Sequence, residues 1–298
     1  MNLTDNDFKN NIDPNHINAE VIADSDYMGK RLTTLKIRVP RIILAEFNTH
    51  RVMSRNFESS RAVPNWKLRK KVLDNPFVPI YWGANKSGMS ASEVLSPSKE
   101  WLCRKVWIVL SKLAVFAHWT MEKIGLHKQT CNRVLEPWLS VSGVVTSTEW
   151  DNFFKLRCHW AAQPEMQALA YCIKRAMEES TPKVMTREDI HLPFIDDEER
   201  SKFTKDELIK ISVARVCRTS YNNNYGAKSN PEEDIKLYGR LLENWHMSPF
   251  ESVAVPIVDG IDEIYHNRNF RGWASIRSFL EPENRLALLK THYDINLS

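Results

Sequence analysis

The spacing of apolar residues in the first two thirds of the chain predicts one strand followed by several helices. Leu, Ile and Val alternate with Lys and Arg over residues 35–39, which predicts a strand that ends at Pro40. Residues 62–98, by contrast, are rich in Pro, Gly, Asn and Ser and predict a long irregular segment. Apolar residues then recur at helical spacing, so that we expect three helices, at residues 99–125, 148–158 and 162–178.

The last third of the chain carries a second set of predicted elements. Residues 211–216 have a strand-like composition, and residues 253–258 predict a further strand. Asn230, followed by Pro and three acidic residues, predicts the N-terminus of a helix. Together the elements favour the α/β (α+β) class, with a mixed or antiparallel sheet and a helix-rich middle region. We divide the chain into a loose N-terminal arm (1–20), a large region (21–185), a polar linker (186–208) and a second region (209–298).

The composition is that of a soluble globular protein, with 43% hydrophobic and 26% charged residues. The net charge of +4 is mild and the short basic run at residues 67–71 is typical of a solvated helix face, so nucleic acid is not an expected partner. The five cysteines show neither metal-ligand spacing nor a disulfide framework, which indicates no metal site and a cytoplasmic setting. The most apolar stretch, residues 106–119, is too short to span a bilayer, so no membrane association is expected.

Residues 49–61 concentrate side chains that bind anions. The segment contains three Arg, one His and one Asn together with several hydroxyl groups. A guanidinium group donates paired, charge-assisted hydrogen bonds to phosphate, so Arg51, Arg55 and Arg61 fit the phosphate of a nucleotide. From this segment alone, arginines in ion pairs on a solvated surface are an equally good interpretation.

Several segments taken together resemble the flavin-dependent thymidylate synthases. In that family a His-Arg pair is followed after seven residues by a Ser, as His50-Arg51 is followed here by Ser59. Further segments resemble the family's motifs in residue type, namely 128–137, 146–157, 162–165, 214–217 and 246–251. Within 128–165 the order of the motifs also agrees, which makes the resemblance far more specific than the first motif alone.

The resemblance implies a role for each matching residue. The expected catalytic residues are Ser59, near the reacting base, and Arg157, which would contact the pyrimidine. The substrate dUMP is expected to contact Ser59, Ser60, Arg61, Arg133 and Arg157. The flavin is expected to contact His50, Arg51, Asn56, Asn152, His246, Ser248 and Glu251.

By the same resemblance, the protein methylates dUMP to dTMP. Methylenetetrahydrofolate is the expected carbon donor and NADPH-reduced FAD the expected hydride source, so folate is a further expected partner. Residues 21–185 would then form the catalytic region that binds nucleotide and flavin, and residues 209–298 would complete the flavin site. Because several subunits build each site in this family, we expect a homo-oligomer, either a tetramer or a dimer.

The order of the segments is unusual for the family. The last two segments precede the His-Arg motif in the familiar members and follow it here, so the chain resembles a circular permutation. Residues 268–278 occupy the place where the motif would otherwise begin, and they resemble a degraded second copy of it. Arg268 or Arg271 is expected to supply the charge that the first motif lacks at Thr49. Some phage-type relatives share this layout, so a phage source and a location in the host cytoplasm fit it.

Several positions depart from the family pattern. The family's Arg, Glu, Tyr, Ser and His are replaced here by Thr49, Phe57, Ala62, Cys217 and Ser252. Thr49 and Phe57 keep a second reaction open, in which water traps the methylene intermediate and the product is a hydroxymethylated deoxypyrimidine monophosphate. The sequence also leaves open a flavin- or nucleotide-binding protein without catalysis, a nucleic-acid binder, and an enzyme with a cysteine nucleophile. No cysteine, however, lies in a recognisable setting for that last role.

Overall fold

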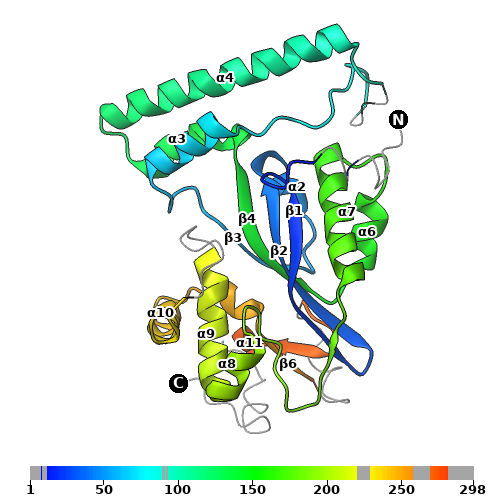
Figure 1. Ribbon diagram of the computed structural model, residues 1–298, viewed down its shortest axis with the longest axis vertical. Coiled ribbons are helices and arrows are strands. Elements are labelled where there is room, and N and C mark those ends of the chain that lie inside the picture. Colours follow the sequence, from blue (N-terminus) through cyan, green and yellow to red (C-terminus); the bar gives the residue numbers. More distant parts are fainter. Residues whose placement is uncertain are drawn as a thin grey trace.

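A five-stranded sheet lies at the centre of the molecule (Figure 1). The structure is a computed structural model that describes residues 8, 12–88, 91, 93–219, 229–257 and 269–280. The strand order is β3-β4-β2-β1-β5, with β1 at Asn18–Tyr27, β2 at Lys30–Pro40, β3 at Ser54–Phe57, β4 at Ser140–Ser147 and β5 at Lys183–Val184. Neighbouring strands are antiparallel except for β1 and β5, which run parallel. The mixed sheet and the end of β2 at Pro40 confirm the prediction.

Strand β4 is buried along its whole length between β2 and β3. Gly143 of β4 lies opposite Phe57 of β3, and a Cβ atom on Gly143 would come within 2.2 Å of the Phe57 ring. Glycine at this position therefore allows the close approach of the edge strand β3. The short helices η1 (Arg41–Ile43) and α2 (Leu44–Phe47) connect β2 to the turn that precedes β3. The anion-binding segment 49–61 thus begins in a turn and continues along the edge of the sheet.

Helices α6 (Asp151–Arg157) and α7 (Pro164–Glu179) pack together, and α7 covers one face of the sheet at β1 and β2 (Figure 1). They confirm two of the predicted helices. Helix α7 begins with Pro164, which suits the first turn of a helix. Its apolar side buries Leu169 and Ile173, and Phe153 of α6 joins the same core. This packing positions the C-terminal end of α6, where Arg157 lies.

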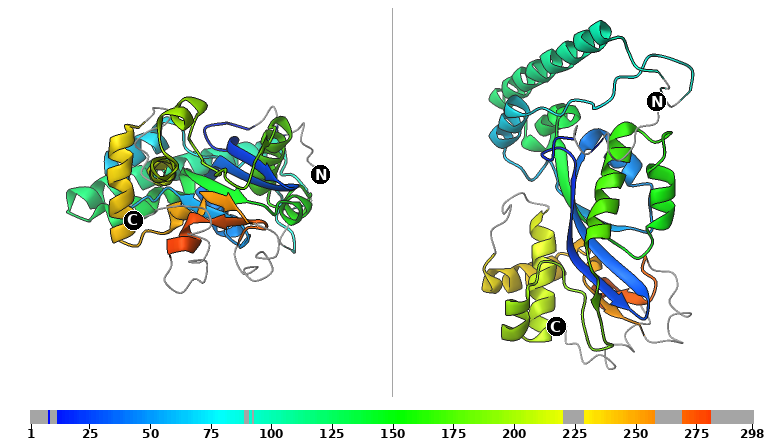
Figure 2. Two further views of the ribbon diagram at one scale, coloured as in Figure 1. Left: turned by 90° about the horizontal axis from the view of Figure 1, so that it is seen from below. Right: turned by 45° about the vertical axis from the view of Figure 1, so that its right-hand side comes forward.

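A helical layer lies across one end of the sheet (Figures 1 and 2). It consists of α3 (Asn65–Asp74), α4 (Pro97–Lys123), α5 (Lys128–Cys131) and η2 (Asn132–Trp138). Helix α4 confirms the long helix predicted at 99–125. Helix α3 corrects the prediction that residues 62–98 are irregular throughout, because Leu68 and Val72 lie one helical turn apart and are both buried. No described helix combines the length and the apolar character needed to cross a membrane.

The C-terminal group of elements packs beside the other end of the sheet (Figure 1). It contains α8 (Asp197–Lys202), α9 (Lys205–Arg218), α10 (Pro231–Glu243), η4 (Ser248–Glu251), α11 (Ile276–Leu280) and an antiparallel pair, β6 (Ala254–Pro256) and β7 (Trp273–Ser275). Helix α10 confirms the predicted cap, because the Asn230 side chain accepts a hydrogen bond from the backbone N–H of Glu232. Strand β6 confirms the strand predicted at 253–258 in a shorter form.

The strand predicted at residues 211–216 is wrong, because these residues lie in α9. Thr204 and Glu207 form a reciprocal capping box that starts this helix. Residues 211–217 are all buried, so the β-branched side chains among them are in contact with the protein interior on every side of the helix. Capping and burial therefore outweigh the local strand preference of the sequence.

The segment predicted to be a linker, residues 186–208, contains regular and buried structure. It includes α8 and the start of α9, and its residues Ile190 and Leu192 belong to the core of the C-terminal group. The acidic residues that suggested a linker serve instead as helix caps and ion-pair partners. The described part of the predicted N-terminal arm is also ordered, since Phe8 is buried and β1 begins at Asn18. The division into two functional regions stays a prediction.

A buried ion-pair network joins three helices of the C-terminal group. Arg215 of α9 donates two hydrogen bonds to the Glu199 carboxylate of α8, at 2.8 and 2.6 Å. The same guanidinium donates to Asp234 of α10 at 3.2 Å and to the Phe194 carbonyl at 2.7 Å. Because all three charged side chains are almost fully buried, the network fixes how α8, α9 and α10 sit relative to one another.

Candidate functional site

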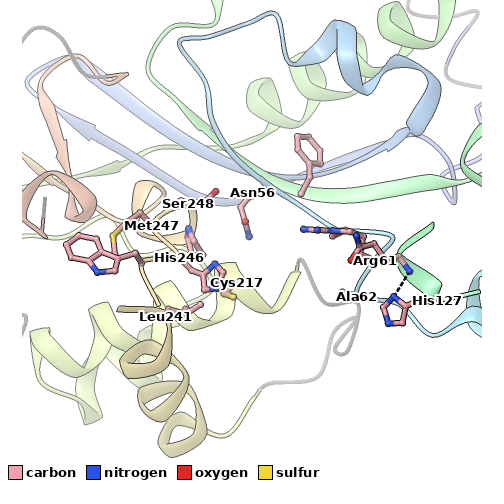
Figure 3. A pocket seen from close by; sticks show the side chains of 14 residues that line it. Asn56, Arg61, Ala62, His127, Cys217, Leu241, His246, Met247 and Ser248 are labelled. Atoms are coloured by element: carbon pink, nitrogen blue, oxygen red, sulfur yellow. Dashed lines mark hydrogen bonds between the residues drawn. The ribbon is translucent and has the colours of Figure 1, made fainter. Parts of the chain in front are cut away.

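A pocket lies between strand β3 with the turn that follows it and the C-terminal group at α10 and η4 (Figure 3). Its volume is about 530 Å³. The residues that line it are Asn56, Phe57, Ser59, Arg61, Ala62, His127, Gln129, Cys217, Leu241, Trp245, His246, Met247, Ser248 and Pro249. The pocket therefore brings together parts of two predicted motifs, 49–61 and 246–251, that are far apart in the sequence.

Two hydrogen bonds hold the C-terminal group against β3. The Asn56 side chain donates from Nδ2 to the carbonyl oxygen of Val216 at 3.0 Å. The Ser248 hydroxyl donates to the carbonyl oxygen of Arg55 at 3.0 Å. Asn56 and Ser248, both predicted to contact flavin, thus lie in the wall of the pocket and also link its two sides.

The side of the pocket that follows β3 is polar. Figure 3 shows Arg61 and His127 across the pocket from His246. Arg61 is exposed, and it forms no hydrogen bond or ion pair within the described part of the chain. His127 accepts a hydrogen bond through Nδ1 from the backbone N–H of Gln129 at 3.2 Å, at the start of α5. Arg61, His127 and the half-buried Ser59 can therefore donate hydrogen bonds to an anionic ligand.

The opposite side of the pocket is more apolar and carries a buried thiol. Leu241, Met247 and Pro249 contribute apolar surface there. Burial raises the pKa of the Cys217 thiol to about 11. Cys217 is therefore protonated at neutral pH, whereas a nucleophilic cysteine has to be a thiolate. The burial of Cys217 therefore argues against a cysteine nucleophile at the pocket.

Ser60 and Arg133, two residues predicted to bind the substrate, meet at Glu136 and do not line the pocket. Glu136 Oε1 accepts hydrogen bonds from Ser60 Oγ at 2.8 Å and from Arg133 Nη1 at 2.7 Å. Arg41 Nη1 donates to the same oxygen at 3.1 Å. Ser60 is buried, whereas the Arg133 side chain is half exposed. Glu136 therefore fixes Ser60 and partly neutralises Arg133.

Glu251, the last of the predicted flavin contacts, is not among the residues that line the pocket. Its carboxylate forms an ion pair with Arg277 of α11. Burial lowers the pKa of the nearby Arg55 guanidinium, and the negative charge of Glu251 partly opposes that shift. Glu251 thus forms an ion pair with a residue of α11 and also affects the pKa of Arg55 in β3.

The segment predicted to be a degraded second motif runs beside the first motif. Asn269 donates from Nδ2 to Ser54 Oγ at 2.9 Å, and the Arg271 backbone N–H donates to Thr148 Oγ1 at 3.0 Å. Arg268 lies outside the described residues. The compensation of Thr49 by Arg268 or Arg271 stays a prediction.

Arg157 lies in a separate group of polar residues, which we call the Arg157 cluster and which consists of Arg157, His50, Glu46 and Thr49. Arg157 forms an ion pair with Glu46, donates from Nε to His50 Nε2 at 2.9 Å, and donates from Nη2 to Thr49 Oγ1 at 3.5 Å. The pKa of His50 is lowered to about 4 by its burial and by the charges of Arg157 and Arg55. His50 is therefore neutral at pH 7 and can accept the hydrogen bond from Arg157.

A second pocket, also of about 530 Å³, adjoins the Arg157 cluster. Its lining consists of Ile42, Glu46, Pro79, Tyr81, Gly83, Ala91, Arg157, Trp160, Ala161, Ala162, Gln163, Pro164, Glu165 and Gln167. It thus includes segment 162–165, which resembles a family motif, and it shares no lining residue with the first pocket. In one chain, the predicted catalytic residues Ser59 and Arg157 therefore line separate pockets.

Two predicted flavin contacts, Arg51 and Asn152, are exposed and line neither pocket. Sequence reasoning also missed residues that do line the first pocket. His127 and Trp245 each lie one position before a segment that resembles the family, at 128–137 and 246–251 respectively. A comparison of motifs considers only the residues inside each motif. Side chains just outside a motif are therefore not predicted, even where they line the same pocket.

The comparisons with known proteins identify a family. The sequence matches the family model described as "Thymidylate synthase complementing protein" over residues 32–183. No curated protein matches it. Among solved structures, the UMP/dUMP methylase PolB from Streptomyces cacaoi bound with 5-Br UMP is similar at 13% sequence identity and a TM-score of 0.43, over 55% of this chain and 89% of that chain. The family model spans β2 to the start of β5 and covers more than half of the 298 residues. The chain belongs to the family of thymidylate synthase complementing proteins.

Proposed function

We propose that this protein is a flavin-dependent thymidylate synthase. In this proposal it methylates dUMP to dTMP, with methylenetetrahydrofolate as the carbon donor and NADPH-reduced FAD as the hydride source. The observation that carries the proposal is the pocket in which Ser59 and Arg61 of one predicted motif face His246 and Ser248 of another. Family membership supports the same substrate, because the family description refers to thymidylate synthesis.

The residues of the pocket fit a nucleotide. A volume of about 530 Å³ lies within the range of roughly 300–1,000 Å³ that is typical of small-molecule sites. Arg61, Ser59 and His127 provide hydrogen-bond donors for a phosphate, and Leu241 and Met247 provide apolar surface for a ring. This combination of donors and apolar surface suits the parts of a flavin or a pyrimidine nucleotide.

Catalysis in this proposal rests on positioning and on charge. The bound flavin and folate would supply the hydride and the one-carbon unit. Arg61 and Ser59 would hold the substrate in the pocket, and Arg157 would donate hydrogen bonds to the pyrimidine as negative charge develops on it. His50 and the Glu46 carboxylate hold the Arg157 guanidinium in one orientation, so that little reorganisation is needed when the substrate binds.

We propose further that the two halves of the site come from different copies of the chain. Ser59 and Arg157 line separate pockets in one chain, although the proposed reaction needs both at one pyrimidine. In a homo-oligomer, Ser59 and Arg157 can act on one pyrimidine if the first pocket of one copy faces the Arg157 cluster of another.

The exposed side of α4 supports self-association. Leu102, Val106, Val109, Leu113 and Phe116 are each at least half exposed. Their alternating spacing of four and three residues is the spacing of a coiled-coil seam, in which one helix packs along another. An apolar stripe of this kind matches a second copy of itself, so we propose that a second copy of the chain covers it.

A hydroxymethylase is the second candidate function. Phe57, which stands where the family pattern has a Glu, lines the pocket and packs against Gly143. The loss of that carboxylate changes which groups surround the methylene intermediate. If water reached the intermediate before the hydride, the product would carry a hydroxymethyl group.

The mass of the nucleotide product tests the proposal. Purified protein is first inspected for a flavin spectrum and then supplied with dUMP, methylenetetrahydrofolate, FAD and NADPH. A product heavier than dUMP by one CH₂ unit is expected, and a reaction without NADPH is the control. A gain of CH₂O would support the hydroxymethylase instead. A protein that neither binds flavin nor changes dUMP would contradict both.

A further inference from the structure

Trp245 occupies a backbone conformation that normally belongs to glycine. It is the first residue after the C-cap of α10 and has a φ of +54°. Two hydrogen bonds close the helix there: the Trp245 N–H donates to the Leu242 carbonyl at 3.1 Å, and the His246 N–H donates to the Leu241 carbonyl at 2.9 Å. This is the Schellman arrangement, in which the left-handed position is usually Gly because any other L-residue is strained there.

The fold gives no reason for a tryptophan at this strained position. Only three non-glycine residues have a positive φ within the described ranges, and the other two are Met28 and Phe194. Met28 lies in the tight turn between β1 and β2, and the Phe194 carbonyl accepts a hydrogen bond from buried Arg215. Trp245, by contrast, is 60% exposed. Its side chain forms no hydrogen bond or ring contact within the part of the chain that the structure describes.

The position of the Trp245 side chain points to a ligand. Trp245 lines the first pocket next to His246, and Arg61 and Ser59 lie in the same lining. An exposed indole at the edge of a pocket offers a flat apolar surface, on which nucleobases and similar rings stack. The cationic and hydroxyl groups of the pocket can meanwhile hold the phosphate of the same ligand.

We propose that Trp245 is a stacking residue for the planar heteroaromatic ring of a nucleotide bound in the first pocket. The choice of a nucleotide rests on the proposed function. The strained backbone is retained, in this inference, because glycine would remove the ring that contacts the ligand. Trp245 is thus a binding residue outside the motifs that the sequence resembles.

Three variants separate the ring from the strain. Trp245→Gly removes both, Trp245→Ala removes the ring and keeps a side chain at positive φ, and Trp245→Phe keeps an aromatic ring. Met28→Gly is the matched control, because it relieves a similar conformation (φ +52°) at a residue that does not line the pocket. Each purified protein is titrated with FAD and with dUMP by fluorescence or calorimetry, and its Tm is measured without ligand.

Opposite changes in stability and in binding are expected for Trp245→Gly. Its Tm rises by roughly 2 °C as the strain is relieved, while its affinity for the ligand falls about tenfold. Trp245→Ala loses the same affinity without the gain in Tm, and Trp245→Phe binds within about threefold of the wild type. Met28→Gly gains stability and keeps its affinity.

The results distinguish this inference from the proposed function. If Trp245→Gly binds each nucleotide as tightly as the wild type does, the inference is overturned and the proposed function stands. If the wild type binds dUMP but not FAD, and only the variants without the ring lose affinity, the inference holds and the flavin part of the proposed function fails. A wild type that binds neither nucleotide contradicts both.

Discussion

The first pocket and the Arg157 cluster hold their arginines in different ways. Arg61 in the pocket is exposed and has no partner among the residues described in the structure. Arg157 has three partners, in Glu46, His50 and Thr49. One arginine is therefore open to a ligand, and the other is held in a fixed orientation by its neighbours.

The two arginines suit different roles in the proposed site. An open cation suits the capture of an anionic group, since it makes its first strong hydrogen bonds when the ligand arrives. A cation that is already oriented suits the stabilisation of charge that develops during a reaction, because no reorganisation is needed at that moment. We therefore expect Arg61 to govern the binding of dUMP and Arg157 to govern the rate of its conversion.

The largest effect is expected from the buried network behind the pocket. Arg215→Ala leaves the buried Glu199 carboxylate without an arginine partner and Asp234 with Arg218 alone, and the loss of one member of a buried ion pair typically destabilises a fold by about 3–5 kcal/mol. Because α9 and α10 carry one wall of the pocket, FAD binding should be lost together with stability. Urea unfolding and FAD titration measure the two effects, with the surface variant Lys70→Ala as the control. A loss of stability below about 1 kcal/mol would contradict this account of the network.

Arg157→Ala should affect the reaction more than binding. The kcat for dUMP conversion is expected to fall about 100- to 1,000-fold, as is typical when a donor to a developing charge is removed. Affinity for FAD should change less than twofold, because the proposed function places Arg157 against the pyrimidine and not against the flavin. Steady-state kinetics and FAD titration test both. A variant that loses FAD affinity while it keeps its kcat would mean that Arg157 contributes to flavin binding and not to the reaction.

Arg61→Ala should show the opposite pattern. The KM for dUMP is expected to rise about 10- to 100-fold, since a hydrogen bond to a charged group contributes about 1.5–3 kcal/mol. The kcat at saturating dUMP should change much less. Arg61→Lys keeps the charge and should recover part of the affinity. An unchanged KM in Arg61→Ala would show that the open arginine does not contact the substrate.

The buried His50 predicts that the stability of the fold depends on pH. Its pKa is about 4 in the folded chain, below the ordinary value of 6.5. Between these values the unfolded chain binds a proton that the folded chain does not, so the free energy of unfolding falls as the pH drops from about 6.5 towards 4, by up to about 3 kcal/mol. Buried His191, with a pKa lowered to about 3, acts in the same direction.

The variant His50→Gln isolates the contribution of His50, because glutamine does not titrate and still offers an oxygen to Arg157. The free energy of unfolding should fall less steeply with acid in His50→Gln than in the wild type, as measured by urea unfolding at several pH values. Identical pH profiles would mean that His50 does not hold a depressed pKa in the folded chain.

The sequence predicted four of the described helices, because their signals come from residues that are close together in the chain. The spacing of apolar positions located α4, α6 and α7, and Asn230 marked the start of α10. The strand predicted at 211–216 failed because a capping box seven residues earlier and burial on all sides decide the helix there. The assembly of the pocket could not be predicted in geometric detail, since it depends on contacts such as that between Asn56 and Val216, which are 160 residues apart.

Mixing two inactive variants tests whether each site forms between two copies of the chain. Ser59→Ala impairs the first pocket, Arg157→Ala impairs the Arg157 cluster, and each alone should be nearly inactive. If sites form between copies of the chain, co-expressed variants should recover roughly a quarter of wild-type activity, because about one site in four then combines two intact halves. If instead Ser59 and Arg157 act within the same chain, every site contains one impaired half, and the mixture should stay as inactive as the separate variants.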